Sequence, residues 1–248
     1  MGIASAVITA RLKIKEIEKQ FEFKLKELET NFRLQQNTEA VREKAKIKVQ
    51  YLNPLRVAAG DLLEKIKDIH SKLMCDDPRK FLKDTFTEIK SKDREQKEEF
   101  VLWCNGFGHY SMSAIYVTAV YFAHASKIRF ELPYMDLDPK DDQVLLDHLS
   151  NVRRAFGGEY NLWETIQDSI GSYLRKPDGT ILNYKEFCEK IIDKSEYLWY
   201  LRLIDFYRDI DMKGEDLTKI MDSLTNLIKF VREVYRPAND IEGQEGKI

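Results

Sequence analysis

The sequence is poor in the residues that interrupt or cross-link a chain, with 3 cysteines, 6 prolines and 11 glycines among 248 residues. So little proline and glycine excludes a collagen-like chain and a disordered Pro/Gly-rich chain. The cysteines, Cys75, Cys104 and Cys188, show no C-x-x-C spacing, so they indicate neither a zinc site nor a thioredoxin-like motif. An odd, sparse set of cysteines is typical of a reduced, cytoplasmic setting.

The chain also lacks an excess of charge of either sign. Its 40 Lys and Arg nearly balance 42 Asp and Glu, which leaves a net charge of −2 and excludes a strongly basic nucleic-acid-binding protein on bulk charge. Many Lys, Glu and Leu residues with few Gly and Pro favour helix over sheet. We therefore predict an all-α fold with little or no sheet, in which a long N-terminal helix precedes a globular domain of about seven helices.

Sequence motifs of catalysis are missing as well. The chain contains neither G-x-S-x-G nor H-E-x-x-H, and it has no P-loop. We therefore expect a protein that is not an enzyme, with no catalytic residue, no bound metal and no cofactor.

What the sequence does contain is a long segment, residues 11–50, without Pro or Gly and with coiled-coil-like spacing of apolar residues. One row recurs every seven positions: Val7, Ile14, Phe21 and Leu28. A second row follows with a slip of one residue: Ala10, Ile17, Leu25 and Phe32. A narrow stripe on a highly charged helix is not stable alone, so it needs a second helix. The predicted oligomerisation residues are Ile14, Ile17, Phe21, Leu25, Leu28 and Phe32.

Residues 1–10 carry no charged side chain, and a basic stretch starts at Arg11. Ten residues cannot span a bilayer, which takes about 20, and a signal peptide would place its positive charges first. Two interpretations stay open. The segment is the end of a membrane anchor trimmed from a longer chain, which places the protein on the cytoplasmic face of a membrane, or it is a helical turn that packs on a partner helix.

The breaks in the pattern predict three regions. These are a stalk helix at residues 1–52, a helical domain at 53–236 and a flexible tail at 237–248. Asn53-Pro54 either caps a new helix or kinks the long one. Residues 91–99 are expected to form a loop or an exposed turn, and we expect no internal repeat.

The longest stretch without charge, residues 100–126, is too polar for a helix that faces lipid. It predicts a buried central helix at 110–131. Further along the chain, Asn183 and Glu186 have the spacing of a capping box.

The glycine-containing segment 105–111, directly before the central helix, is the candidate ligand site. Glycines let a backbone approach a ligand closely, and free N–H groups at a helix start attract anions. The alternative is a tight turn that leads into a buried helix. The predicted ligand-binding residues are Asn105, Gly106, Gly108, His109, Ser111, His124 and Arg129. His109 and His124 are over 20 Å apart along a straight helix, so they cannot share one metal ion.

These patterns favour a non-enzymatic interaction protein that self-associates through its N-terminal helix or binds a helical protein partner, with no nucleic acid involved. The alternative is a ligand-binding sensor or effector with a pocket at the glycine-containing segment.

Overall fold

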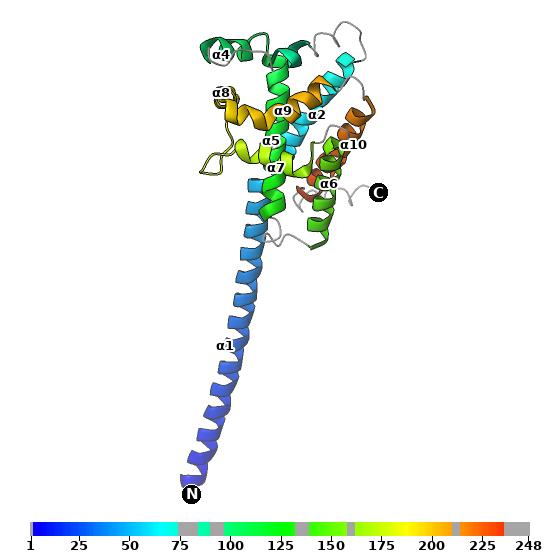
Figure 1. Cartoon of the computed structure of the whole chain (residues 1–248). Coiled ribbons are helices and arrows are strands. Elements are labelled where there is room, and N and C mark those ends of the chain that lie inside the picture. Colours follow the sequence, from blue (N-terminus) through cyan, green and yellow to red (C-terminus); the bar gives the residue numbers. More distant parts are fainter. Residues whose placement is uncertain are drawn as a thin grey trace. The chain divides into compact units, whose positions relative to one another are not determined.

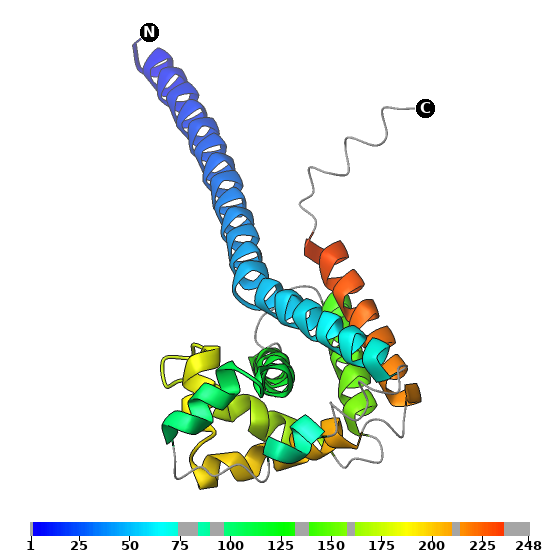
Figure 2. The ribbon, with the colours of Figure 1, turned by 90° about the horizontal axis from the view of Figure 1, so that it is seen from above.

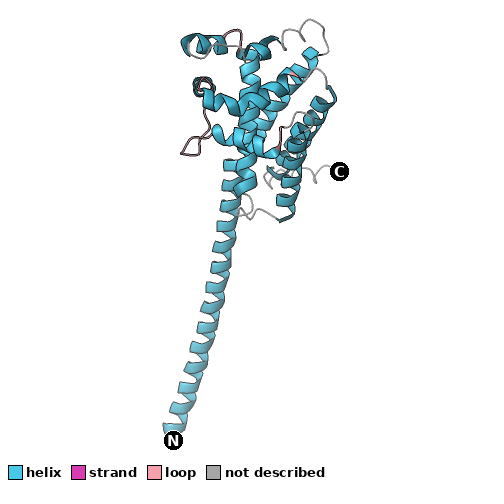
Figure 3. Ribbon diagram, viewed as in Figure 1, coloured by secondary structure: helices cyan, strands magenta, loops and turns pink. Residues whose placement is uncertain are grey.

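The computed structural model describes residues 2–73, 84–89, 97–131, 139–157, 162–209 and 214–235, which form helices joined by turns and loops (Figures 1, 2 and 3). One isolated antiparallel bridge, between Arg175 and Ile181, is the extent of β-structure in this described part. The prediction of an all-α fold is confirmed. The chain divides into two compact units, Met1–Lys46 and Ile47–Ile248.

The first unit consists of helix α1, which spans Gly2–Ile47. Its 46 residues extend over about 69 Å at 1.5 Å per residue. The confirmed long N-terminal helix therefore has no neighbouring helix within its own unit.

The backbone stays helical through Asn53-Pro54. A π-helical turn, Lys48–Leu52, is followed by α2, Asn53–Leu73, and the Asn53 N–H donates to the carbonyl of Lys48, five residues back. Asn53 is itself helical, and its side-chain oxygen accepts from Arg56 at 2.9 Å. Because Asn53 already has helical dihedral angles, the interpretation of this residue as the cap of a new helix is wrong. The wider π turn accommodates Pro54, which has no N–H to donate. The predicted tail at 237–248 lies outside the described residues.

Helix α5, His109–Glu131, is the centre of the second unit. It contacts α2, α4 (Lys97–Asn105), α7 (Glu164–Tyr173), α8 (Tyr184–Lys190) and α9 (Lys194–Arg208). Because it has neighbours on several sides, its buried residues are spread around the helix rather than along one face. The predicted buried central helix is confirmed, and Figure 2 shows α5 end-on among its neighbours.

Helix α4 begins at Lys97 and so corrects the last three residues of the expected loop at 91–99, whereas residues 91–96 lie outside the described residues. Phe100, Trp103 and Cys104 are buried at the i, i+3, i+4 spacing of one helix face. Glu98 and Glu99 lie in its first turn, where the helix dipole favours negative charge. The charge of this turn, which suggested a loop, thus fits a helix start.

The other main packing involves α10, Gly214–Tyr235, which contacts both α2 and α6, Pro139–Gly157. Its buried face repeats at three- and four-residue spacing: Leu217, Ile220, Leu224, Leu227, Ile228 and Val231. This face joins the core that surrounds α5.

The predicted capping box is confirmed at the start of α8. The Glu186 N–H donates to Asn183 Oδ1 at 3.0 Å, and the Asn183 N–H donates to Glu186 Oε2 at 2.9 Å. The box fixes the position of Tyr184, whose hydroxyl donates to the carbonyl of Cys104 at 2.9 Å. Local capping thereby connects α8 to α4.

Within the described residues, no helix combines the length and the apolar character that a membrane crossing requires.

Candidate functional site

Large apolar side chains of α1 are exposed to solvent. The exposed fraction is 66% for Phe21, 66% for Leu28 and 61% for Phe32. Ile17 and Leu25 are exposed as well. We call these five residues (Ile17, Phe21, Leu25, Leu28 and Phe32) the apolar stripe. The sixth predicted residue, Ile14, lies in α1, but its side chain is outside the described part of the structure.

The apolar stripe occupies one side of the helix. At about 100° per residue, its five members fall within an arc of about 80° and extend over about 23 Å. The same side continues with Gln36, Glu39 and Glu43, so the stripe ends at Phe32. A stripe of this width is what a single partner helix covers.

A second, sparser set of exposed apolar residues lies on the opposite side of α1: Phe23, Leu34 and Val41. Phe23 is about 200° around the helix from Phe21, although only two residues separate them. Its exposed fraction of 72% is similar to that of Phe21. The two phenylalanines therefore offer a matched pair for mutation.

The glycine-containing segment forms a tight turn between α4 and α5. The N–H groups of Gly106 and Gly108 both donate to the carbonyl of Trp103, at 3.1 and 2.8 Å. The His109 N–H donates to the carbonyl of Gly106 at 3.1 Å. A Cβ added at Gly108 would lie 2.5 Å from the Trp103 ring. Close packing on Trp103 accounts for this glycine, and the three N–H groups are engaged within the chain.

The remaining predicted ligand residues are spread along α5. Asn105, at the end of α4, is exposed, whereas Ser111 is buried. The ring of His109 contacts the Tyr184 ring edge-on, at 5.2 Å between centroids. Burial, together with the smaller effects of the positive charges of Lys127 and Arg175, lowers the pKa of His124 to about 4.

Arg129 belongs to an ion-pair cluster between α5, α6 and α7. Arg129 Nη2 lies 2.5 Å and Arg153 Nη2 lies 3.0 Å from the same carboxylate oxygen, Asp168 Oδ2. Arg153 Nη2 also donates to the carbonyl of Glu164 at 2.8 Å. Because Arg129 is 20 residues from His109 on one helix, about 30 Å separate them. The structure does not bring the seven predicted ligand residues together, and a ligand site at the glycine-containing segment stays a prediction.

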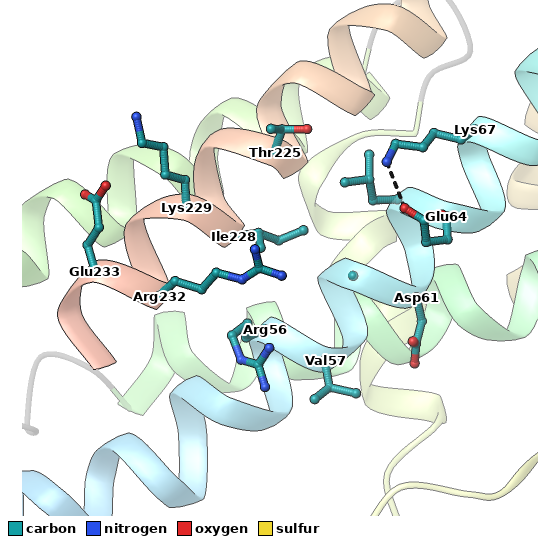
Figure 4. Close-up of a pocket in the computed structure, with 12 residues that line it drawn as sticks. Arg56, Val57, Asp61, Glu64, Lys67, Thr225, Ile228, Lys229, Arg232 and Glu233 are labelled. Atoms are coloured by element: carbon teal, nitrogen blue, oxygen red, sulfur yellow. Dashed lines mark hydrogen bonds and ion pairs between the residues drawn. The ribbon is translucent and has the colours of Figure 1, made fainter. Parts of the chain in front are cut away.

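A groove that the sequence did not predict lies between α2 and α10 (Figure 4), with a volume of ≈ 690 Å³. Gly60 lines the groove and leaves open space beside it, since a Cβ built there meets no atom within 4 Å. Charges of both signs line its rim; Lys67 Nζ, for example, lies 2.8 Å from Glu64 Oε1. None of the seven predicted ligand residues lines this groove. The glycine in the middle of the α2 sequence was the one signal that could have found it.

No protein-family description, no curated protein and no solved structure matches this chain. The functional conclusion therefore depends on the residues themselves.

Proposed function

We propose that this chain is a non-enzymatic interaction protein that self-associates through the apolar stripe of α1. The observation that carries the proposal is the alignment of five exposed large apolar side chains on one side of a long charged helix. Exposed apolar residues that are contiguous mark interaction sites, whereas isolated ones are common on any surface. A second copy of the chain carries the same stripe and is present wherever the protein is present, so it is the partner that we propose.

The size of the stripe supports a reversible association. Two copies contribute ten side chains, and burying each is worth about 1.5 kcal/mol, for a total near ~15 kcal/mol. Association costs roughly 4–15 kcal/mol in lost freedom. With a cost of about 8 kcal/mol, inside this range, the net gain is about 7 kcal/mol, which corresponds to a dissociation constant of about 10 μM. The test therefore has to cover concentrations on both sides of this value.

The test compares Phe21→Glu with Phe23→Glu by sedimentation equilibrium of the full chain, from about 1 to about 200 μM. Phe21→Glu removes two buried rings per dimer and introduces two charges, so the dissociation constant should rise at least about a hundredfold. Phe23→Glu makes the same chemical change on the opposite side of the helix and should leave the constant nearly unchanged. The helical circular dichroism signal of both variants checks that each still folds.

Two results would contradict the proposal. A wild-type chain that stays monomeric across the whole range would exclude self-association at the proposed strength. Equal weakening by both variants would show that association does not use the apolar stripe.

A ligand-binding sensor or effector is the second candidate function, and the groove between α2 and α10 is the observation that favours it. Native mass spectrometry of the gently purified chain tests it. A reproducible added mass that disappears in Gly60→Phe, which fills the base of the groove, would support this function. A wild-type spectrum without added mass would count against it.

We also propose a reduced, cytoplasmic setting for the chain, supported by the burial of the cysteines Cys104 and Cys188. A membrane tether upstream of Arg11 stays a separate proposal. Carbonate extraction of membranes from cells that express the native-length chain tests it: a chain that is released entirely into the supernatant would refute the tether.

A further inference from the structure

Helix α1 contains an 11-residue repeat. Residues 12–22 read LKIKEIEKQFE, and residues 23–33 read FKLKELETNFR. Five of the eleven positions are identical: Lys13/Lys24, Lys15/Lys26, Glu16/Glu27, Glu18/Glu29 and Phe21/Phe32. The expectation of no internal repeat is therefore wrong for this helix.

The period decides how two copies of α1 can pack. Eleven residues make three helical turns plus about 20°, so the two repeats present the same side of the helix. The slip of one residue in the second apolar row follows from this period. A heptad alternates spacings of three and four residues, whereas Ile17, Phe21 and Leu25 are separated by two successive spacings of four. An 11-residue period gives a straight or slightly right-handed supercoil, whereas a heptad period gives a left-handed one.

Charges on the two edges of the apolar stripe have opposite signs. Lys24 is on one edge, about 60° from Phe21, and Glu22 and Glu29 are on the other edge, about 80–100° from it. All three side chains are exposed. Lys24 and Glu29 are five residues apart, and the preceding repeat has the same two residue types at positions 13 and 18.

The edge charges distinguish between the two directions of pairing. In a parallel pair related by a two-fold axis along the helices, the edge with Lys24 meets the partner's edge with Glu29. In register, residues five apart are offset by about 7.5 Å along the axis, which the long side chains of Lys and Glu can bridge. In an antiparallel pair each edge meets its own kind, so the glutamates face glutamates. Opposite charges across such a contact stabilise it, and like charges destabilise it.

We infer that α1 pairs with α1 of a second copy in parallel and in register, with Lys24 of each copy opposite Glu29 of the other. This inference rests on the proposed self-association and specifies its direction. The apolar stripe provides the contact, and the charged edges exclude the reversed pairing.

Carbodiimide cross-linking of the full chain tests the direction, since this reagent joins an amine to a carboxylate only where the two are in contact. Equal amounts of unlabelled and 15N-labelled chains are mixed, cross-linked and digested. The expected product is a cross-linked Lys24–Glu29 peptide pair in which one peptide is unlabelled and the other is 15N-labelled. Glu29→Gln should abolish this product while the chain remains a dimer by light scattering.

A charge-reversal cycle gives an independent measurement. Lys24→Glu places two like-charged pairs in each dimer and should weaken self-association roughly tenfold. Lys24→Glu combined with Glu29→Lys restores both pairs and should return the dissociation constant to about the wild-type value. In an antiparallel dimer neither expectation holds, because Lys24 and Glu29 lie on edges that do not meet.

The results separate the inference from the proposed function. A wild-type dimer without the mixed-label Lys24–Glu29 product overturns the parallel pairing and leaves self-association intact. A wild-type chain that is monomeric by light scattering at all concentrations overturns both. A dimer that gives the product and recovers in the double variant supports both.

Discussion

The crossing of α5 and α7 leaves no room for a side chain at Gly171, and this makes Gly171→Ala a sharp test of the fold. A Cβ built at Gly171 would lie 2.7 Å from the backbone carbon and oxygen of Phe122 and 2.8 Å from the Ala123 nitrogen. Ordinary contacts of a Cβ begin at 3.4 Å, so the two helices would have to separate by about 0.7 Å. Because the obstacle is backbone, no side-chain rotation relieves it.

The magnitude follows from two opposing terms. Overpacking a core costs about 1–3 kcal/mol, and here the upper value applies because α5 and α7 must move as a whole. Replacing a helical glycine with alanine gains about 1 kcal/mol in helix propensity. Gly171→Ala should therefore destabilise the second unit by about 2 kcal/mol.

Gly60→Ala is the matched control, because Gly60 also lies inside a helix but its added Cβ meets no atom within 4 Å. Here the propensity gain stands alone, so the variant should be more stable than the wild type by about 1 kcal/mol. The same substitution is thus expected to change the free energy of unfolding in opposite directions at two helical positions.

Thermal unfolding followed by tryptophan fluorescence measures both effects, since Trp103, Trp163 and Trp199 all lie in the second unit. The midpoint should fall by about 6 °C in Gly171→Ala and rise by about 3 °C in Gly60→Ala. A Gly171→Ala chain at least as stable as the wild type would refute the close approach of α5 and α7.

Two further predictions concern charges in the second unit. Asp168→Ala removes the nearer carboxylate partner of Arg153, whose side chain is 5% exposed, and leaves it the Glu164 carboxylate at 3.5 Å. The free energy of unfolding should therefore fall by about 3 kcal/mol in urea titrations; a loss under about 1 kcal/mol would contradict this. The pKa of His124 is about 4 in the folded chain and near 6.5 in the unfolded one, so below pH 6.5 only the unfolded state takes up this proton. Stability should therefore fall by about 3 kcal/mol as the pH drops from 6.5 to 4, and His124→Gln should lack this component; equal pH profiles for both chains would disprove the assignment.

Much of the fold could be predicted from the sequence because its apolar residues follow helical periods. The central helix is recognisable at residues 110–131 by its lack of charge, and α8 by the pairing of Asn183 with Glu186. Helix α4 was missed at its start because charged residues are common both in loops and in the first turn of a helix. The π turn before Asn53 also escaped prediction, since a local pattern of Asn-Pro fits a cap and a continuing helix equally well.

The candidate sites were less predictable, because the space beside a glycine can be filled by a ligand or by a neighbouring side chain. Gly108 has a neighbour, the Trp103 ring, whereas Gly60 has open space. No sequence pattern distinguishes these two cases, since the distinction depends on which helices pack together. The apolar stripe, in contrast, could be found from spacing alone, because it lies on a single helix.

The exposed apolar residues of the two units differ in arrangement, and this difference supports an interaction role for α1. In the second unit they are scattered over several elements: Val49, Val57, Leu102, Phe107, Phe130, Trp163, Leu198 and Trp199. Scattered exposure of this kind is normal for a folded domain and needs no partner. On α1 the five residues of the apolar stripe share one side, include two pairs eleven positions apart (Ile17/Leu28 and Phe21/Phe32) and have opposite charges on their two edges. Chance exposure explains none of these three regularities, whereas pairing with a second copy of the helix accounts for all of them.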